Sequence, residues 1–76
     1  MVLLLEKLWV KSKKIQLLNY DPETFTLEVE YNDGDIYRYF GVPDYIYEKL
    51  KQAKDKDQFF VKYIKHAGFS NENIQQ

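Results

Sequence analysis

A strict alternation of apolar and polar residues over positions 25–31 is the feature that most restricts how this chain can fold. Apolar side chains at every second position lie on one face of a β-strand, and the polar ones between them lie on the other. The turn-forming run Asn32-Asp33-Gly34 follows, and a second run with several aromatic residues occupies positions 35–40. This order predicts a β-hairpin with one face turned toward a hydrophobic core.

The length of the turn decides which face the following side chains occupy. A two-residue turn at Asp33-Gly34 would bring Arg38 onto the apolar face, opposite Val29. A three-residue loop that includes the preceding asparagine, with the glycine in a left-handed bulge, places Tyr37 opposite Val29 and Arg38 opposite Glu28. A cross-strand pair contributes about 0.2–1 kcal/mol, whereas burying an unpaired charge costs more. We therefore predict the three-residue loop.

A third strand and two helices complete the predicted fold. Residues 15–20 form an apolar run that Asp21-Pro22, a dipeptide typical of type I turns, separates from the hairpin. Beyond the hairpin, apolar residues recur every three or four positions, which predicts helices that begin near Val42-Pro43-Asp44 and at Asp57, the second ending at Gly68. We predict an α+β fold, a small three-stranded antiparallel β-meander with two C-terminal helices packed on one face.

The chain has 76 residues and therefore forms one domain, since so short a chain cannot build two cores. We expect residues 1–9 to be an N-terminal extension that forms an extra strand or a short helix, residues 10–68 to be the folded domain, and residues 69–76 to be a disordered tail. The absence of cysteine excludes disulfides, thiolate metal sites and cysteine nucleophiles. Seven tyrosines, five phenylalanines and one tryptophan are expected to supply much of the core instead.

The apolar N-terminus raises the question of a targeting or membrane segment. Glu6-Lys7 interrupts the apolar run over residues 1–5, so the run is shorter than a signal-peptide core of about 7–15 residues. A membrane span would need about 20 apolar residues. We expect a cytoplasmic protein that makes no contact with a membrane.

No catalytic constellation is recognisable in the sequence. His66 is the single histidine, and it shares the polar face of the second predicted helix with Lys62 and Lys65, which favours exposure to solvent. Neither a metal site nor a cofactor site is predicted, and no small-molecule substrate is inferred. We expect a protein that is not an enzyme.

The lysines form the candidate binding surface. The net charge of −1 conceals an acidic middle, residues 21–48, between two flanks that carry most of the lysines. Lysines spaced three apart share one side of a helix and can hold a phosphate backbone, on which Trp9 or Tyr45 could stack a base. A sequence pI near 5.7 leaves open the alternative that these lysines only solvate the helices. The candidates are Lys11, Lys13, Lys14, Lys51, Lys54, Lys62 and Lys65.

An ordered series of short motifs over residues 10–65 resembles the KTSC domain, a family named after the C-terminal domain of some lysyl-tRNA synthetases. The resemblance implies a small stand-alone bacterial or phage protein with no catalytic residues and with a suggested role in RNA binding. Tyr37-Arg38-Tyr39 matches the central Tyr-x-Tyr motif, which we expect to be structural because both rings are predicted to face the core. The series is Val10-x-Ser12-x-x-Ile15, Tyr20-Asp21, Leu27-x-Val29, Gly34-x-x-Tyr37-x-Tyr39, Val42-Pro43, Tyr47-x-x-Leu50, Ala53, Phe59-Phe60 and Ile64.

The chain departs from the family pattern near the second predicted helix. Asp57 stands where a glycine is common, and Val61 stands where an asparagine is common. Gly68-Phe69-Ser70 replaces basic residues that often follow the last helix, which removes charges that would favour RNA.

Two functions of different classes follow from these observations. The first is a small non-enzymatic module that binds RNA or another nucleic acid through its lysine-bearing helices. The alternative is a protein–protein interaction or self-association module that uses the acidic sheet face or the apolar N-terminus. In the second case we expect a homodimer with Leu3, Leu5, Leu8 or Trp9 at the interface.

Overall fold

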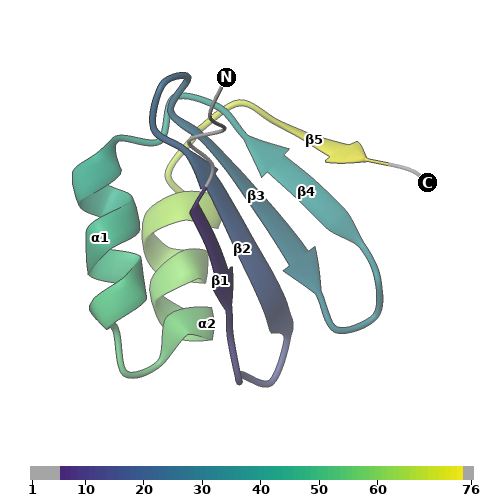
Figure 1. Ribbon diagram of the computed structural model, residues 1–76. Coiled ribbons are helices and arrows are strands. Elements are labelled where there is room, and N and C mark those ends of the chain that lie inside the picture. The colour runs from purple at the N-terminus through teal and green to yellow at the C-terminus, as the bar shows by residue number, and fades with distance from the viewer. Residues whose placement is uncertain (1–5, 75–76) are drawn as a thin grey trace.

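The computed structural model describes residues 6–74 and shows an antiparallel sheet with helices packed against one of its faces (Figure 1). The strands lie in the order β1-β2-β3-β4-β5, so each strand pairs with its neighbours in sequence. The helical segments α1, α2 and η1 stand between β4 and β5, and η1 is a π-helical turn that continues α2 directly. The bounds are β1 (Glu6–Trp9), β2 (Ile15–Asp21), β3 (Thr26–Tyr31), β4 (Ile36–Tyr39), α1 (Asp44–Gln52), α2 (Lys56–Phe60), η1 (Val61–Lys65) and β5 (Asn71–Ile74).

The predicted α+β class with an antiparallel sheet and two helices is confirmed, but the predicted number of three strands is wrong. β1 and β5 extend the central β2-β3-β4 meander to five strands. β1 forms within the predicted N-terminal extension, whose residues 1–5 lie outside the described part of the chain. The helices are not C-terminal, because β5 follows them and pairs with β4.

Residues 69–76 were expected to be a disordered tail, yet Asn71–Ile74 form β5. Two contacts bring the chain back to the sheet after the helices. Phe69 packs against the core, and the backbone amide of Phe40 donates a hydrogen bond of 2.9 Å to the carbonyl of Ser70. Once Ser70 is held beside the end of β4, the next residues pair with the free edge of that strand.

The predicted register of the central hairpin is confirmed. Val29 lies opposite Tyr37 and Glu28 lies opposite Arg38. The loop closes through a 2.8 Å hydrogen bond from the Tyr31 amide to the carbonyl of Asp35, and its glycine has a φ of 98°. The Arg38 guanidinium lies 3.1 Å from the Glu28 carboxylate, so the charge that would have been buried in the other register is paired on the outer face.

The first helix begins at Asp44, at the predicted entry, whereas the predicted N-cap of the second helix is wrong. Asp55, two residues earlier, occupies the cap position, and its side chain accepts a 3.0 Å hydrogen bond from the amide of Gln58. Asp57 lies inside the first turn of α2 and is used for a contact with the β1–β2 turn that is described below.

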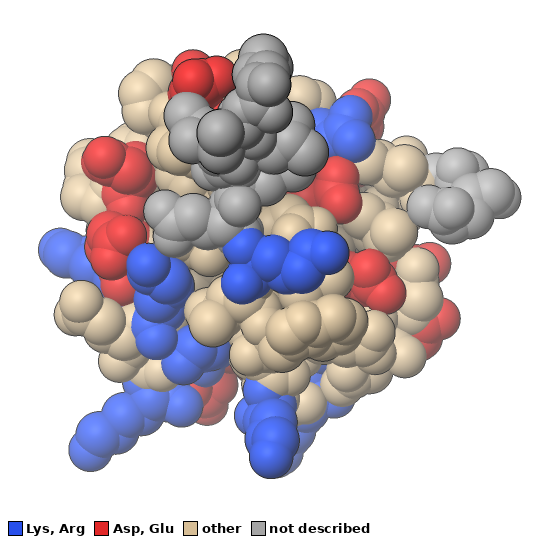
Figure 2. Space-filling model, viewed as in Figure 1, with Lys and Arg blue, Asp and Glu red and all other residues tan. Residues whose placement is uncertain are grey.

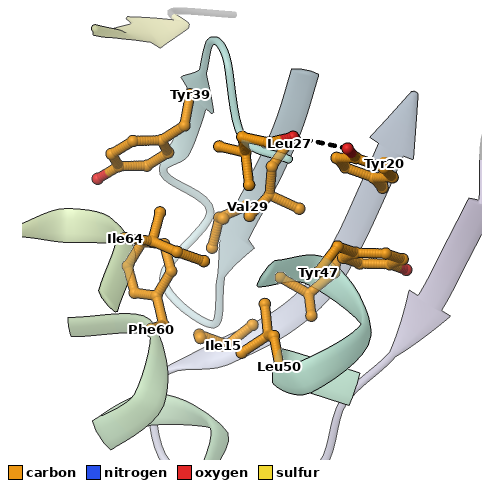
Figure 3. Close-up of a cluster of buried hydrophobic side chains, with 11 residues drawn as sticks. Ile15, Tyr20, Leu27, Val29, Tyr39, Tyr47, Leu50, Phe60 and Ile64 are labelled. Carbon is orange, nitrogen blue, oxygen red and sulfur yellow. Dashed lines mark hydrogen bonds between the residues drawn. The ribbon is translucent and has the colours of Figure 1, made fainter. Parts of the chain in front are cut away.

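The core lies between the helices and the face of the sheet formed by β2, β3 and β4 (Figure 3). Three ring contacts join the layers, and the two shortest involve β2 and β4. Tyr20 of β2 stacks on Tyr47 of α1 with ring centroids 4.5 Å apart, and Tyr39 of β4 meets Phe60 of α2 edge to face at 5.4 Å. The hydroxyl of Tyr20 donates a 2.6 Å hydrogen bond to the carbonyl of Val42, drawn as a dashed line in Figure 3. This bond holds the β4–α1 connection against the sheet.

Replacing Tyr20 by phenylalanine tests the contribution of that buried hydrogen bond. We expect Tyr20→Phe to lower the free energy of unfolding by about 1–3 kcal/mol, because the change leaves the buried carbonyl of Val42 without this donor. The measurement is urea denaturation followed by circular dichroism. Tyr45→Phe removes the same atom from a side chain that is 60% exposed and should leave the midpoint unchanged. Equal effects of the two variants would contradict the role of the bond.

Three tyrosines gather at the β3–β4 side of the core. The ring of Tyr37 lies 6.0 Å from that of Tyr31 and 6.5 Å from that of Tyr39. Burial raises the pKa of the Tyr31 hydroxyl above its ordinary value, and the neighbouring Tyr39 and Tyr37 raise it further. Burial also raises the pKa of Tyr39, with a smaller effect from Tyr37. The folded state therefore holds these protons more tightly than the unfolded chain does.

This difference predicts a loss of stability in alkaline solution. Tyrosines of the unfolded chain ionise near pH 10, so the stabilisation is fully present below about pH 10 and is lost as the pH rises toward the higher pKa of the folded state. Urea denaturation between neutral pH and about pH 11 should show this decline. Tyr31→Phe should decline less steeply, and Tyr45→Phe should behave like the unsubstituted protein. A stability that stays constant or rises up to about pH 11 would contradict this account.

Candidate nucleic-acid interface

The described residues include a groove of about 630 Å³ between the β1–β2 turn and the start of α2. The β1–β2 turn forms one wall, and the α1–α2 turn with the exposed side of α2 and η1 forms the other. The six lysines that line this groove are Lys11, Lys13, Lys14, Lys54, Lys56 and Lys62. Segments that lie forty or more positions apart in the sequence thus contribute to one basic surface, which we call the lysine groove.

Five of the seven lysines proposed from the sequence line the lysine groove. Lys51 lines an adjoining hollow of about 340 Å³ that also includes Lys11 and Lys54. Its ammonium already lies 3.1 Å from the Glu48 carboxylate and 5.2 Å from the centre of the Tyr47 ring. Lys51 is thus positioned at the rim and is held by contacts of its own.

Lys65 lies apart from the other candidates. It lines a separate groove of about 440 Å³ beside His66 and the hairpin residues Asp33 and Asp35. His66 is exposed there. The two lysines of the last helical segment therefore line different grooves, since Lys62 borders the lysine groove and Lys65 does not.

The sequence reasoning missed Lys56. The seven candidates include Lys54 but not Lys56, although Lys56 stands only two positions further along the sequence. Lys56 begins α2, and its ammonium donates a 3.0 Å hydrogen bond to the carbonyl of Ala53. This bond satisfies a carbonyl near the end of α1 and holds the cation at the α1–α2 turn, where it lines the lysine groove.

Asp57 fastens the two walls of the lysine groove together. Its Oδ1 accepts a 3.0 Å hydrogen bond from the Ser12 hydroxyl, and its Oδ2 accepts bonds of 3.0 and 3.3 Å from the backbone amides of Lys13 and Lys14. On the other side of the turn, the Asn32 side chain donates a 2.9 Å bond to the carbonyl of Lys13. The backbone that carries three of the lysines is thus held from both sides.

The lysine groove has a positive local charge although the whole chain is slightly acidic. Asp55 and Asp57 are its two acidic residues, and both carboxylates accept hydrogen bonds from backbone amides. Figure 2 shows basic side chains gathered over the lower part of the face that carries β1, with acidic side chains mainly toward the top and along both sides. The surface that an approaching anion meets at this end of the molecule is therefore basic.

The acidic face of the sheet, the other surface proposed from the sequence, is partly neutralised. Arg38 lies 3.1 Å from the Glu28 carboxylate and 3.4 Å from that of Glu72 on β5. The Glu30 carboxylate accepts a 3.2 Å hydrogen bond from the side chain of Gln16. Arg38 of the Tyr-x-Tyr motif therefore links three strands across the outer face, while Tyr39 of that motif is buried in the core.

The apolar residues near the N-terminus differ in their exposure to solvent. Leu8 packs against the core, whereas Trp9 is 67% exposed. Leu3 and Leu5 lie outside the described residues. Across positions 6–74, no helical segment has both the length and the apolar character needed to cross a membrane.

These features define a small α+β domain in which an antiparallel sheet is covered on one face by helices and a basic groove lies at one end. The family model of the KTSC domain matches residues 11–69. The chain therefore belongs to the KTSC domain family, as the motif series predicted.

A solved structure and several proteins resemble this chain. The crystal structure of a KTSC domain protein from Yersinia pestis superimposes with a TM-score of 0.84, at 30% sequence identity, and the match covers 93% of this chain and 99% of that one. A Stutzerimonas stutzeri protein described as uncharacterized is 33% identical over 61 residues, which is 80% of this chain and 86% of that protein.

The other relatives are much longer proteins. A lysine–tRNA ligase from a Nostoc species is 45% identical over 51 residues, which is 67% of this chain and 9% of the ligase. A lysine–tRNA ligase from Nostoc punctiforme is 41% identical over 51 residues, with the same coverage. The match therefore spans about a tenth of the length of these ligases.

Removing the Asp57 carboxylate tests whether this side chain holds the lysine-bearing turn. We expect Asp57→Ala to accelerate hydrogen exchange at the amides of Lys13 and Lys14, which lose their acceptor. Exchange followed by NMR measures this directly. Asp55→Ala is the matched control, because it removes the α2 cap and costs about 1 kcal/mol without touching the turn. If both variants accelerate exchange at these two amides equally, the tether is not the cause of their protection.

Proposed function

We propose that this protein is a non-enzymatic RNA-binding module that holds the phosphate backbone in the lysine groove. The observation that carries this proposal is the convergence of six lysines from the β1–β2 turn, the α1–α2 turn and the last helical segment on one groove. Each lysine is a point charge on a flexible stem, and several of them along a groove can follow a chain of phosphates.

The near-neutral total charge is compatible with this function because the charges are segregated. Glu28 and Glu72 lie on the outer sheet face and do not line the lysine groove, although Asp33 of the hairpin lines a neighbouring hollow with Lys13 and Lys14. The two aspartates within the lysine groove accept hydrogen bonds from backbone amides. Affinity for a phosphate backbone depends on the local number of cations that displace counterions, and not on the net charge of the chain.

The relatives lend support of a different kind. Segments of two lysine–tRNA ligases match the same domain at 41–45% identity, and the names of those proteins refer to tRNA. An RNA-binding accessory role for this domain agrees with that occurrence. The ligases' own reaction is not transferred, since the match spans 9% of their length.

Self-association is the second candidate function, and the exposure of Trp9 on the edge strand β1 favours it. An edge strand presents unpaired backbone groups to another chain, and an exposed tryptophan adds apolar area to such a contact.

Sedimentation equilibrium distinguishes the two candidate functions by measuring the molecular mass in solution. A homodimer that forms through β1 should dissociate to a monomer when Trp9 is replaced by glutamate.

The salt dependence of RNA binding tests the first proposal. We expect the affinity for a labelled single-stranded RNA to fall steeply with salt, with a slope near −0.7 per phosphate contact. Lys62→Gln should weaken binding and reduce the slope by about 0.7. Lys65→Gln, three positions along the same segment but outside the lysine groove, should change neither quantity. The readout is fluorescence anisotropy at several salt concentrations.

Two outcomes would contradict the proposal. One is the absence of binding to RNA at low salt. The other is an equal loss of affinity in Lys62→Gln and Lys65→Gln, because that result would assign the effect to overall charge and not to the lysine groove.

A further inference from the structure

Trp9 is an exposed aromatic side chain next to the lysine groove. It lines the adjoining hollow together with Lys51 and with three lysines of the lysine groove, Lys11, Lys54 and Lys56. Two thirds of its surface is accessible to solvent, the largest exposed fraction among the exposed large hydrophobic residues that the structure describes. Within residues 6–74, no ring contact involves Trp9, so both faces of the indole are left without an aromatic partner.

The register of β1 explains why the indole is exposed. Leu8 lies opposite Leu18, which faces the core, so the alternation of the strand turns Lys7 and Trp9 to the outer face. Lys11 follows two positions later. β1 is an edge strand of the sheet, and no further strand of residues 6–74 pairs with its outer edge. An indole with a lysine two positions away in each direction thus stands at the border of the lysine groove.

The other exposed aromatic residues are less well placed. Tyr45 is in the first turn of α1, about 10 Å along the helix axis from Gln52, and it does not line the lysine groove or the adjoining hollow. The Tyr63 ring lies 4.6 Å from that of Phe59 and 5.3 Å from the Lys62 ammonium, so its faces have partners within the fold. Among the exposed rings of residues 6–74, Trp9 is the one that has no aromatic partner and shares a hollow with lysines of the lysine groove.

We propose that Trp9 stacks on an unpaired base of the RNA whose phosphates lie in the lysine groove, and that the domain consequently binds single-stranded RNA in preference to duplex. This inference rests on the proposed function. Every base has a flat face that can stack on an indole, whereas the bases of a duplex already stack on one another inside the helix. A duplex can offer phosphates to the lysines but no base face to Trp9.

Trp9 is the single tryptophan of the chain, so its fluorescence reports on this site alone. Titration with an unlabelled oligouridylate of about 12 nucleotides should quench the emission as the base stacks on the indole. A duplex RNA of the same length should bind more weakly and leave the emission nearly unchanged. Both titrations use the full chain at low salt.

Three variants identify the contribution of the ring. Trp9→Ala should lower the affinity for the labelled oligouridylate roughly 5- to 100-fold and should reduce the preference over duplex to near unity. Trp9→Phe keeps an aromatic face and should lose less. Tyr45→Ala, a matched loss of an exposed ring outside the lysine groove, should bind like the unsubstituted protein. Circular dichroism checks that each variant is folded.

The outcomes distinguish this inference from the function on which it rests. If RNA does not bind at all, both fail. If binding depends on Lys62 but the emission is not quenched and Trp9→Ala binds normally, the stacking role is overturned and the lysine groove stands. Emission that changes with protein concentration in the absence of RNA would assign Trp9 to self-association and would also overturn it.

Discussion

Ring contacts between the sheet and the helices are the interactions on which the rest of this structure depends. The chain has no cysteine, so packing has to hold its two layers together without covalent help. Tyr20 on Tyr47 fixes α1 against β2, and Tyr39 against Phe60 fixes α2 against β4 (Figure 3). These four rings determine where the α1–α2 turn comes to lie, and therefore where the second wall of the lysine groove stands.

The lysine groove is a consequence of this layering. β1 and β2 form the first hairpin of the sheet, and their turn emerges at the end of the domain where α1 ends and α2 begins (Figure 1). Asp57 converts this proximity into a fixed geometry by accepting three hydrogen bonds from the β1–β2 turn. An aspartate is well suited to this position, since a carboxylate has two oxygens and can accept from a hydroxyl and from two amides at once.

The sequence predicts the centre of the fold better than its edges, and the reason is physical. The hairpin register follows from local rules. A two-residue turn would bury the Arg38 charge, which is so unfavourable that only the three-residue loop is compatible with the fold. β5 reads Asn-Glu-Asn-Ile and has no alternating apolar pattern, so its strand conformation comes from pairing with β4 and not from its own residues. The N-cap of α2 was predicted at the wrong residue because Asp55 and Asp57 satisfy the same local rule, and only the contacts of Asp57 with the β1–β2 turn distinguish them.

The separation of charge also determines how an anionic partner would meet the domain. A chain with a net charge of −1 has little long-range attraction for RNA, so encounter depends on the orientation of its charge distribution. Arg38 lowers the repulsion of the acidic face by joining Glu28 and Glu72, while the cations collect at the opposite border of the sheet. The end of the molecule that carries the lysine groove therefore has six lysines against two aspartates, and both aspartates accept hydrogen bonds from backbone amides. Trp9 lies on the edge strand β1, beside the lysines. The end of the domain toward which the electrostatic potential would orient an anionic partner therefore also carries an exposed aromatic ring.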